Sequence, residues 1–395
     1  MPMRHHPIRF LIAATTCSLI VCSPARLDAQ SPTDEARQHL ARARELAGSA
    51  FLTTEEVQCN ELGEGDPYRA GGKESHLPPT RVFDNLYYVG TDRLGAWAVQ
   101  TSAGIILINA MHTGSAESMV AGGLRKVGLD PAQVKYVIVT QADGDEYGGA
   151  KYFQDKYAAQ VIMSPEDWTE AARLAAIRPS RTRAGDSLGG GSRRGGGGGG
   201  GGGTGGRGGG GFGGGRGGFG GGRGGGGGGF GRSGSTGGNR SAGNESAAVD
   251  DVPHRDLTAV DGQTFTLGNE TVTVLMTPSH TAGTISVIVP VTDHGTPHTA
   301  VVLGGTEIPA GSDMKNAYIT SLAHLSKVAD SAHADVELNS YPFVDNAVPR
   351  MDSLRRAKGP MTNPFVIGTD GLHRYLDVLS ECGWVSLLGP RRPAD

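Results

Sequence analysis

The sequence has few of the features that would place it in a membrane or hold it together by many disulfides. Only four of its 395 residues are cysteine, and Cys59 and Cys382 are the two outside the segment Met1–Ala29. They allow one disulfide, tying an N-terminal extension to a C-terminal helix, and two unrelated buried thiols are the alternative. Beyond Cys22 no apolar stretch is long enough to cross a bilayer, which takes about 20 residues.

The N-terminal segment carries basic residues, then an apolar run from Phe10 to Cys22, then small and polar residues. This order is typical of a secretory signal peptide, and the run is too short for a membrane span. We expect cleavage near Ala29 and an exported protein, periplasmic or secreted. A lipoprotein processed at Cys22 is the second interpretation, which bulky Val21 disfavours.

Charge is distributed unevenly along the chain. The formal net charge is -4; Met1–Ala29 contributes +2 and Gly189–Gly243 contributes +7, so the remaining chain carries -13. A body this acidic does not favour nucleic acid as a partner of its globular surface.

The stretch Gly189–Gly243 is nearly all glycine, with seven arginines and three phenylalanines. It has too little apolar side chain to offset its ordering entropy, so we predict a disordered insertion over residues 186–246. A flexible surface loop is the favoured interpretation, since added loop length costs little stability. Two alternatives stay open: single-stranded nucleic-acid binding, as in RGG-like segments, and a basic loop lying against the acidic body over the cleft.

The rest of the chain predicts strands alternating with helices. Strands are expected at Leu86–Val89, Ala96–Gln100 and Ile105–Ile108, and then at 136–139, 160–163, 264–267, 271–276, 300–304 and 335–338. Helices are expected at 31–48, where Thr33 would be the N-cap, and at 115–127, 149–157, 165–174 and 316–331. From residue 49 to about Pro79 we find no regular pattern. Such alternation predicts parallel βα units, and two of them would make a sandwich of two sheets with helices outside.

The chain is organised around Lys135–Ala150. Its predicted buried strand breaks at Thr140 into a loop that carries Asp143, Asp145 and Glu146. Three carboxylates in one short turn raise each other's pKa unless a cation or hydrogen-bond donors neutralise them. Oxygen ligands indicate a hard or borderline divalent metal. The alternative is an acidic loop that caps the next helix.

This stretch resembles the metallo-β-lactamase fold superfamily. A strand, a threonine, a six-residue ligand loop and Tyr-Gly-Gly follow one another as in that family, whose loop reads HxHxDH. Here the loop runs from Gln141 to Glu146 as QADGDE, so Asp145 alone keeps the family residue. The segment TPSHTAG around His280 is similar to the family's TPGHTPG, whose histidine is a metal ligand.

Two further positions depart from the family pattern. The third strand ends in Asn109, where the family usually has an aspartate that supports the metal loop. Tyr341 stands before Pro342, where family members place a last histidine ligand. The resemblance covers Val82 to about Arg356 outside the insertion, and is greatest to the third subclass of metallo-β-lactamases and its non-lactamase relatives.

The resemblance implies an α/β fold, an αββα sandwich of two mixed sheets with helices on the outer faces. It places this domain at 81–395, after a signal peptide at 1–29 and an N-terminal helix and extension at 30–80. It would also gather one set of side chains at the sheet ends: Gln141, Asp143, Asp145, Glu146 and His280, with Tyr341 as a possible addition. Other histidines, among them His112, His254 and His298, show no such spacing and are expected to be solvated.

In active relatives these positions bind one or two zinc ions, which activate water for attack on an acyl carbon or phosphorus. Asp145 would orient that nucleophile. The oxygen-rich set here suits manganese, magnesium, calcium or iron better than zinc. Two functions stay open: an exported hydrolase of small molecules, β-lactams among the candidates, with an altered metal site, and a catalytically degenerate binding protein.

Overall fold

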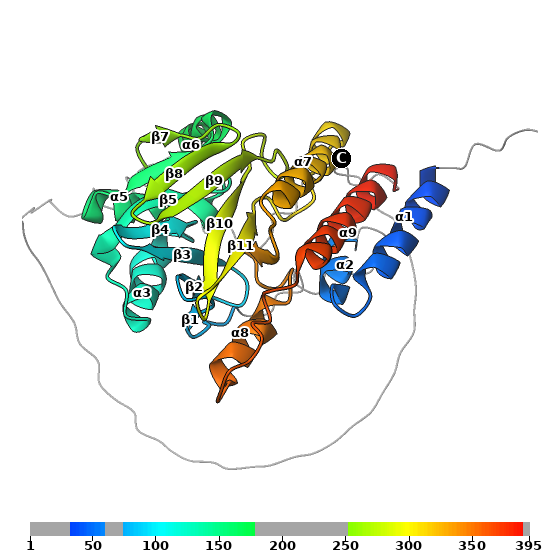
Figure 1. Cartoon of the computed structure of the whole chain (residues 1–395). Helices are drawn as coiled ribbons and strands as arrows, with labels where there is room; N and C mark the ends of the chain where they lie inside the picture. Colours follow the sequence, from blue (N-terminus) through cyan, green and yellow to red (C-terminus); the bar gives the residue numbers. More distant parts are fainter. Residues whose placement is uncertain (1–31, 60–73, 178–251, 390–395) are drawn as a thin grey trace, which may run out of the picture.

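A computed structural model describes residues 32–59, 74–177 and 252–389 (Figure 1). Two mixed β-sheets lie face to face, and helices cover both outer faces. This confirms the predicted αββα sandwich. The predicted signal peptide at 1–29 and the predicted insertion at 186–246 lie outside the described residues, so both stay predictions.

The seven-stranded sheet has the order β1-β2-β3-β4-β5-β6-β7. Its strands are β1 (Thr80–Arg81), β2 (Leu86–Gly90), β3 (Gly95–Thr101), β4 (Gly104–Ile108), β5 (Val134–Ile138), β6 (Gln160–Met163) and β7 (Leu257–Thr258). Pairing is antiparallel from β1 to β4 and parallel from β4 to β7. Short turns suffice for the antiparallel strands, whereas the parallel strands β5 and β6 each follow a helical crossover.

The helices of this half lie where the sequence predicts them, with two differences. They are η2 (Thr113–Ser115), η3 (Ala116–Ala121), α3 (Gly122–Lys126), η4 (Pro131–Gln133), α4 (Gly144–Tyr147), α5 (Ala150–Tyr157) and α6 (Pro165–Ile177). The predicted helix at 115–127 is a π-helix in its first half. The acidic stretch, predicted as a loop, contains the helical turn α4.

The five-stranded sheet has the order β12-β11-β10-β9-β8. Its strands are β8 (Gln263–Leu267), β9 (Glu270–Met276), β10 (Ile285–Asp293), β11 (Thr296–Leu303) and β12 (Val336–Asn339). The helix α7 (Ser312–Ser331) carries the chain from β11 to β12, and these two strands are parallel. Two helices that the sequence patterns did not delimit, α8 (Ala347–Arg356) and α9 (Thr369–Leu388), follow.

The facing sides of the two sheets form the central core. Trp97 and Ile106 from the first sheet and Val274, Val287 and Val302 from the second are fully buried there. Each such side chain contributes roughly 1.5–3 kcal/mol relative to an exposed one. Separate apolar clusters fill the space between each sheet and its helices. Strands covered on both faces read as continuous apolar runs, as β2 does.

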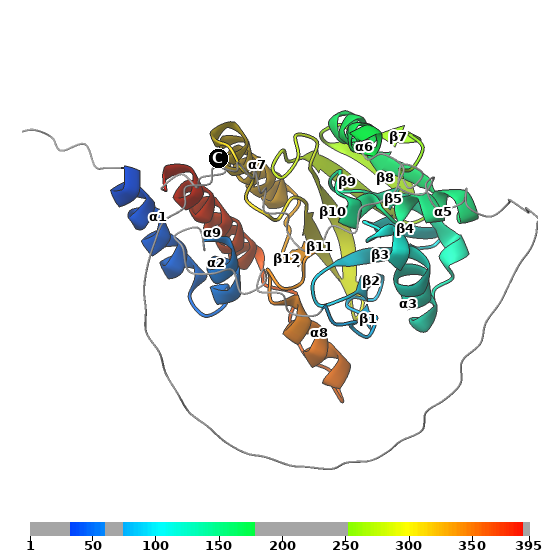
Figure 2. The same ribbon diagram turned by 180° about the vertical axis from the view of Figure 1, so that it is seen from behind.

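The N-terminal extension packs on the C-terminal helix. The helices α1 (Pro32–Ala47) and α2 (Leu52–Gln58) lie beside α9 (Figures 1 and 2). Ala36, Ala43 and Ala47 are buried on the predicted face of α1, but the helix begins at Pro32, so Thr33 is not its N-cap. The prediction missed α2, because the residues that α2 buries are polar: Thr54, Glu55 and Gln58.

Cys59, directly after α2, forms a disulfide with Cys382 of α9. This confirms the first of the two alternatives predicted for these cysteines. In the described ranges, no helix is both long and apolar enough to span a bilayer.

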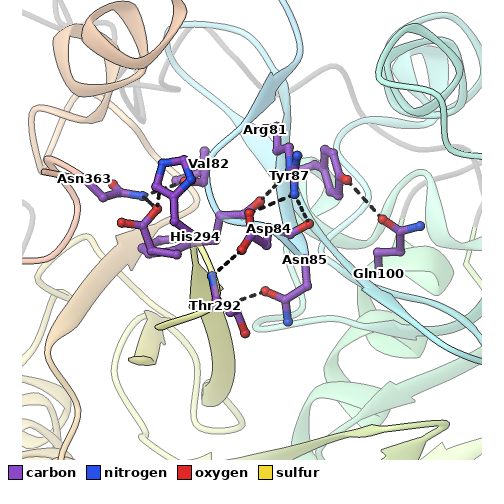
Figure 3. Close-up of polar contacts among 12 residues, drawn as sticks. Arg81, Val82, Asp84, Asn85, Tyr87, Gln100, Thr292, His294 and Asn363 are labelled. Atoms are coloured by element: carbon purple, nitrogen blue, oxygen red, sulfur yellow. Dashed lines mark hydrogen bonds and ion pairs between the residues drawn. The ribbon is translucent and has the colours of Figure 1, made fainter. Parts of the chain in front are cut away.

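A polar seam joins the two sheets at the end of β10 (Figure 3). The backbone amide of Asp84 donates to the Thr292 carbonyl at 2.7 Å, and the Thr292 amide donates to Asn85 Oδ1 at 3.1 Å. The Asn363 side chain donates to the Val82 carbonyl at 2.7 Å. Because β10 begins at Ile285 and reaches this seam at its last residues, the loop that carries His280 lies at the opposite end of the strand.

Candidate functional site

Asn109 holds together the strand ends around the candidate site. It follows β4, is fully buried, and has a left-handed backbone (φ 63°), which asparagine tolerates better than most residues. Its Nδ2 donates to Thr140 Oγ1 at 3.0 Å and to Ser340 Oγ at 2.8 Å, and its Oδ1 accepts from the Thr140 amide at 2.8 Å. The side-chain amide of Asn109 therefore both donates and accepts hydrogen bonds, whereas an ionised aspartate, the usual residue of the family at this position, could only accept them.

The acidic residues lie on a single helical turn. Asp143 is the N-cap of α4, and its carbonyl accepts from the amides of Glu146 and Tyr147 at 2.9 Å. Asp145 and Glu146 occupy the first turn of this helix, where backbone amides favour negative charge. The turn gives the two carboxylates different environments, because Glu146 is 1% exposed whereas Asp145 is only partly buried.

Five of the six predicted site residues make one hydrogen-bonded network. Asp143 Oδ2 accepts from Gln141 Nε2 at 3.1 Å and lies 2.9 Å from His280 Nε2. The Tyr341 hydroxyl donates to Asp145 Oδ2 at 3.0 Å and accepts from Gln141 Nε2 at 3.5 Å. The structure therefore brings the imidazole, which lies far along the chain, to the acidic turn. We define the network as Gln141, Asp143, Asp145, His280 and Tyr341.

The sixth residue, Glu146, is next to the network, close enough to Tyr341 for that side chain to lower its pKa. Its Oε2 atom is buried without a partner, and so is Oε1 of Gln141. Burial, followed by the charge of Asp145, raises the pKa of the Glu146 carboxyl well above its usual value, although Tyr341 opposes the rise. Two acceptor oxygens at the site thus lack a donor among the described residues.

The charges of the network depend on its contacts. Burial would lower the pKa of His280, but the hydrogen bond to Asp143 and the charge of that carboxylate raise it to about 9. The Asp143–His280 contact is therefore an ion pair at neutral pH. Burial and the charge of Asp143 raise the pKa of Asp145, while the hydrogen bond from Tyr341 limits the rise.

The network does not fit the zinc centre that the fold family implies. In the part of the chain that the structure describes, no group of three or more His, Cys, Asp or Glu side chains is placed to hold a metal ion. The reason lies in the contacts: Asp143 and His280 engage each other, and Asp145 is engaged by Tyr341. Zinc centres rely on imidazole or thiolate, and this set offers one imidazole.

The prediction for the remaining histidines was wrong at two positions. His112 is partly buried, its Nδ1 has no partner among the described residues, and its charge lowers the pKa of Asp145. His298 is half-buried and pairs with Asp335 at 2.6 Å. His254 is exposed, as predicted. The position of His112 beside the acidic turn results from the fold, and its sequence spacing gives no sign of it.

The sequence also gave little indication of Asp167. It lies in the first turn of α6, where its amide donates to Ser164 Oγ at 3.1 Å, and it is 1% exposed. Neither carboxylate oxygen completes a hydrogen bond with a described residue. Burial raises the pKa of this carboxyl to about 7, although the Thr281 hydroxyl opposes the rise. Asp167 and His280 line the same cavity, of about 580 Å³.

Comparison with known proteins agrees with this architecture. Residues 96–293, about half of the chain, match the family model described as the metallo-beta-lactamase superfamily. No curated protein matches the chain significantly.

Three solved structures illustrate the likeness in fold. BJP-1, a subclass B3 metallo-beta-lactamase of Bradyrhizobium japonicum, is 20% identical with a TM-score of 0.52, covering 78% of this chain and 92% of its own. A variant of the FEZ-1 metallo-beta-lactamase from Legionella gormanii is 20% identical with a TM-score of 0.54, covering 80% and 98%. A metallo-beta-lactamase from Cronobacter sakazakii, described by its HARLDQ motif, is 20% identical with a TM-score of 0.50, covering 76% and 91%.

Proposed function

Since this chain belongs to the metallo-β-lactamase superfamily and its fold is close to subclass B3, we propose that it binds a small molecule in the family's cleft without a resident zinc centre. Protein side chains take the place of the metal. The observation that carries this proposal is the 2.9 Å contact between His280 and Asp143, because it engages the one imidazole of the predicted ligand set.

A metal would have to compete with a proton for His280. With a pKa of about 9, the imidazole carries a proton at neutral pH and has no free lone pair on Nε2. Removing that proton near pH 7 costs about 3 kcal/mol, which lowers metal affinity roughly a hundredfold. The metal would also have to break the ion pair with Asp143. Both costs work against zinc binding at this site.

A second candidate function is a hydrolase with an oxygen-rich metal site. Two observations favour it: the partnerless oxygens Gln141 Oε1 and Glu146 Oε2, and the excess of carboxylates over cations around Asp145. Manganese, magnesium or iron would suit such a set better than the zinc expected from the family. When bound, a divalent ion would polarise the substrate and activate water.

The Cronobacter protein adds to this second candidate. With the aspartates matched, the HARLDQ motif and the QADGDE of this chain share the residues at Ala142 and Asp145. Both differ from the family's HxHxDH at two or more histidine positions. A loop with replaced histidines therefore occurs in a protein described as a metallo-beta-lactamase.

Elemental analysis of the purified mature chain separates the two functions. We expect far less than one zinc, manganese or iron per chain after growth with each metal, and a melting temperature that a chelator leaves unchanged. Nitrocefin, lactone and phosphoester panels should stay uncleaved, with BJP-1 treated in parallel as a positive control for nitrocefin. A stoichiometric metal that is lost in Asp145→Asn and His280→Ala, together with turnover of any of these substrates, would favour the hydrolase.

Export is part of the same proposal. The order of basic, apolar and small residues in Met1–Ala29 supports it, and so does the Cys59–Cys382 disulfide, since disulfides persist in oxidising compartments. Cell fractionation should find the protein in the periplasm or the medium, shortened by about 29 residues on mass spectrometry. Full-length protein in the cytoplasm would contradict it.

A further inference from the structure

A cavity of about 580 Å³ opens beside the network, between the first turns of α6 and the loop that leads into β10. Acidic side chains dominate the α6 wall, and the other walls come from the loop and from α7. The residues used below are Glu166, Asp167, Glu170, His280, Thr281 and Met314. A cavity of this size holds a small organic ligand, since such pockets range from about 300 to 1,000 Å³.

Asp167 is the most unusual of these side chains. It is 1% exposed, and although the Thr281 hydroxyl and the Ala142 backbone amide lie near enough to lower its pKa, neither carboxylate oxygen completes a hydrogen bond with a described residue. A Cβ at Gly283 would lie 2.6 Å from the Asp167 Cγ, so glycine at this position lets the loop lie directly on the carboxylate. A buried carboxylate that completes no hydrogen bond is costly, and a ligand with N–H groups or positive charge would relieve that cost.

The other charges on the cavity wall are largely neutralised by neighbours. His280 is paired with Asp143 at 2.9 Å. Glu170 accepts two hydrogen bonds from Arg173, at 2.6 and 2.5 Å. Glu166 is exposed and makes no ion pair with a described residue. The charge that remains uncompensated at the cavity is therefore negative, and comes from Glu166 and, as the pH rises through about 7, from Asp167.

We propose that this cavity binds the cationic group of a small molecule, an amine or a guanidinium, on the carboxylate of Asp167. Glu166 attracts the cation at the rim, and Met314 offers an apolar surface to the rest of the ligand. This inference rests on the proposed small-molecule binding and names the class of ligand. Anionic ligands are disfavoured, because they would meet the same two carboxylates.

Calorimetric titration of the mature chain tests the charge preference directly. The probes share one scaffold and differ in charge: phenethylamine, phenethylguanidine, phenethyl alcohol and phenylacetate. We expect the two cations to bind at least about tenfold more tightly than the alcohol, and phenylacetate to bind more weakly than either cation. Equal affinity for cation and alcohol would overturn the proposal, and so would the absence of any cation binding.

Matched variants locate the site. Asp167→Asn keeps the side-chain shape and should weaken phenethylamine about tenfold or more, whereas Glu166→Gln at the rim should weaken it about twofold. Glu45→Gln removes the same charge from exposed α1, at the end of the molecule away from α6 (Figures 1 and 2), and should change nothing. Unchanged binding in Asp167→Asn would overturn the assignment.

A second variant, Glu166→Lys, is available in case Asp167→Asn does not fold. If Asp167→Asn fails to fold, Glu166→Lys still tests the idea, because this position is exposed and reversing its charge should reduce the preference for cations about fourfold. An unchanged preference in Glu166→Lys would contradict the proposal. The result is separable from that on metal content. If the cation preference is absent, the chain can still bind neutral molecules without zinc, as the proposed function states. If a stoichiometric metal is found, the wild type and Asp167→Asn can still be compared for cation binding.

Discussion

Asn109 Nδ2 lies 2.8 Å from Ser340 Oγ, although 231 residues separate them. Asn109 follows β4 of the first sheet, and Ser340 follows β12 of the second. This hydrogen bond therefore joins the two halves of the sandwich beside the network. The same asparagine holds the Thr140 amide, from which the acidic turn continues.

Asn109→Ala should destabilise the fold by about 2–4 kcal/mol, because it leaves the buried Thr140 amide without an acceptor and places alanine in a left-handed conformation. Urea unfolding followed by circular dichroism measures the loss. Asn316→Ala on the exposed face of α7 is the matched control, expected to change stability by less than about 0.5 kcal/mol. Similar losses in the two variants would show that Asn109 is not special.

The Asp143–His280 pair predicts a pH-dependent stability. The pKa of His280 is about 9 in the folded protein, against 6.5 as its ordinary value, so the stabilisation is fully present below pH 6.5 and is lost as the pH rises through 9. The shift corresponds to about 3 kcal/mol; the side chain is 31% exposed, and screening reduces this to about 1–2 kcal/mol. Asp143→Asn should be less stable than the wild type by this amount below about pH 6.5, and no less stable above about pH 9.

Two measurements check this pair. Nuclear magnetic resonance titration should place the imidazole pKa near 9 in the wild type and near its ordinary 6.5 in Asp143→Asn. Unfolding free energies on both sides of this interval should converge for the two proteins as the pH rises. A wild-type pKa that stays near 6.5 would rule out the ion pair.

Asp167 also predicts that stability falls as the pH rises, but over a lower pH range than the Asp143–His280 pair. Its folded pKa of about 7 lies above the ordinary 3.8, so the unfolded chain releases the proton first and stability falls as the pH rises between these values. From about pH 5 to about pH 8, Asp167→Asn should gain roughly 2–3 kcal/mol relative to the wild type. Asp370→Asn, at an exposed position on α9, is the control for the substitution itself. Parallel pH profiles for wild type and Asp167→Asn would contradict the expectation.

Sequence patterns were sufficient to predict the strands of the two sheets, but not the contacts between elements that lie far apart in the chain. The strands from Leu86 to Ile108 follow from β-branched and aromatic runs between turn residues, and the structure confirms them. The helix α2 was missed because it buries threonine, glutamate and glutamine, which patterns treat as surface residues. Its burial is decided by α9, more than 300 residues away, which no local pattern contains.

The candidate site shows the same division. The acidic turn and His280 were found from local motifs, and the structure brings them together. Which atom bonds to which was not predictable, because Asp143 could face His280, a metal or solvent with the same sequence spacing. His112 and Asp167 were missed for a related reason: their functional environment consists of residues from other elements.

The Cys59–Cys382 disulfide should stabilise the N-terminal extension on α9. It closes a loop of 323 residues, and removing such a bridge costs about 2–5 kcal/mol. We expect the double variant Cys59→Ala/Cys382→Ala to melt at a lower temperature than the wild type and to be insensitive to dithiothreitol. Dithiothreitol should lower the melting temperature of the wild type to that of the double variant. Equal melting with and without reductant would show that the bridge adds no stability.

Restoring the family's nitrogen ligands tests the central argument most directly. In the variant Gln141→His/Asp143→His/Glu146→His/Tyr341→His, four imidazoles replace the amide, two carboxylates and the phenol. The loss of Asp143 frees the Nε2 of His280, whose pKa should fall toward its ordinary value, and the loss of Tyr341 frees the carboxylate of Asp145. Zinc centres prefer such donors, so the variant should hold one or two zinc ions per chain, lose them to a chelator and then melt at a lower temperature.

The control Tyr341→Phe removes the phenol hydroxyl without adding a nitrogen, and should stay free of zinc. If the four-histidine variant folds but binds no more zinc than Tyr341→Phe, then side-chain identity at these positions is not what keeps the metal out, and the explanation based on the Asp143–His280 pair is wrong.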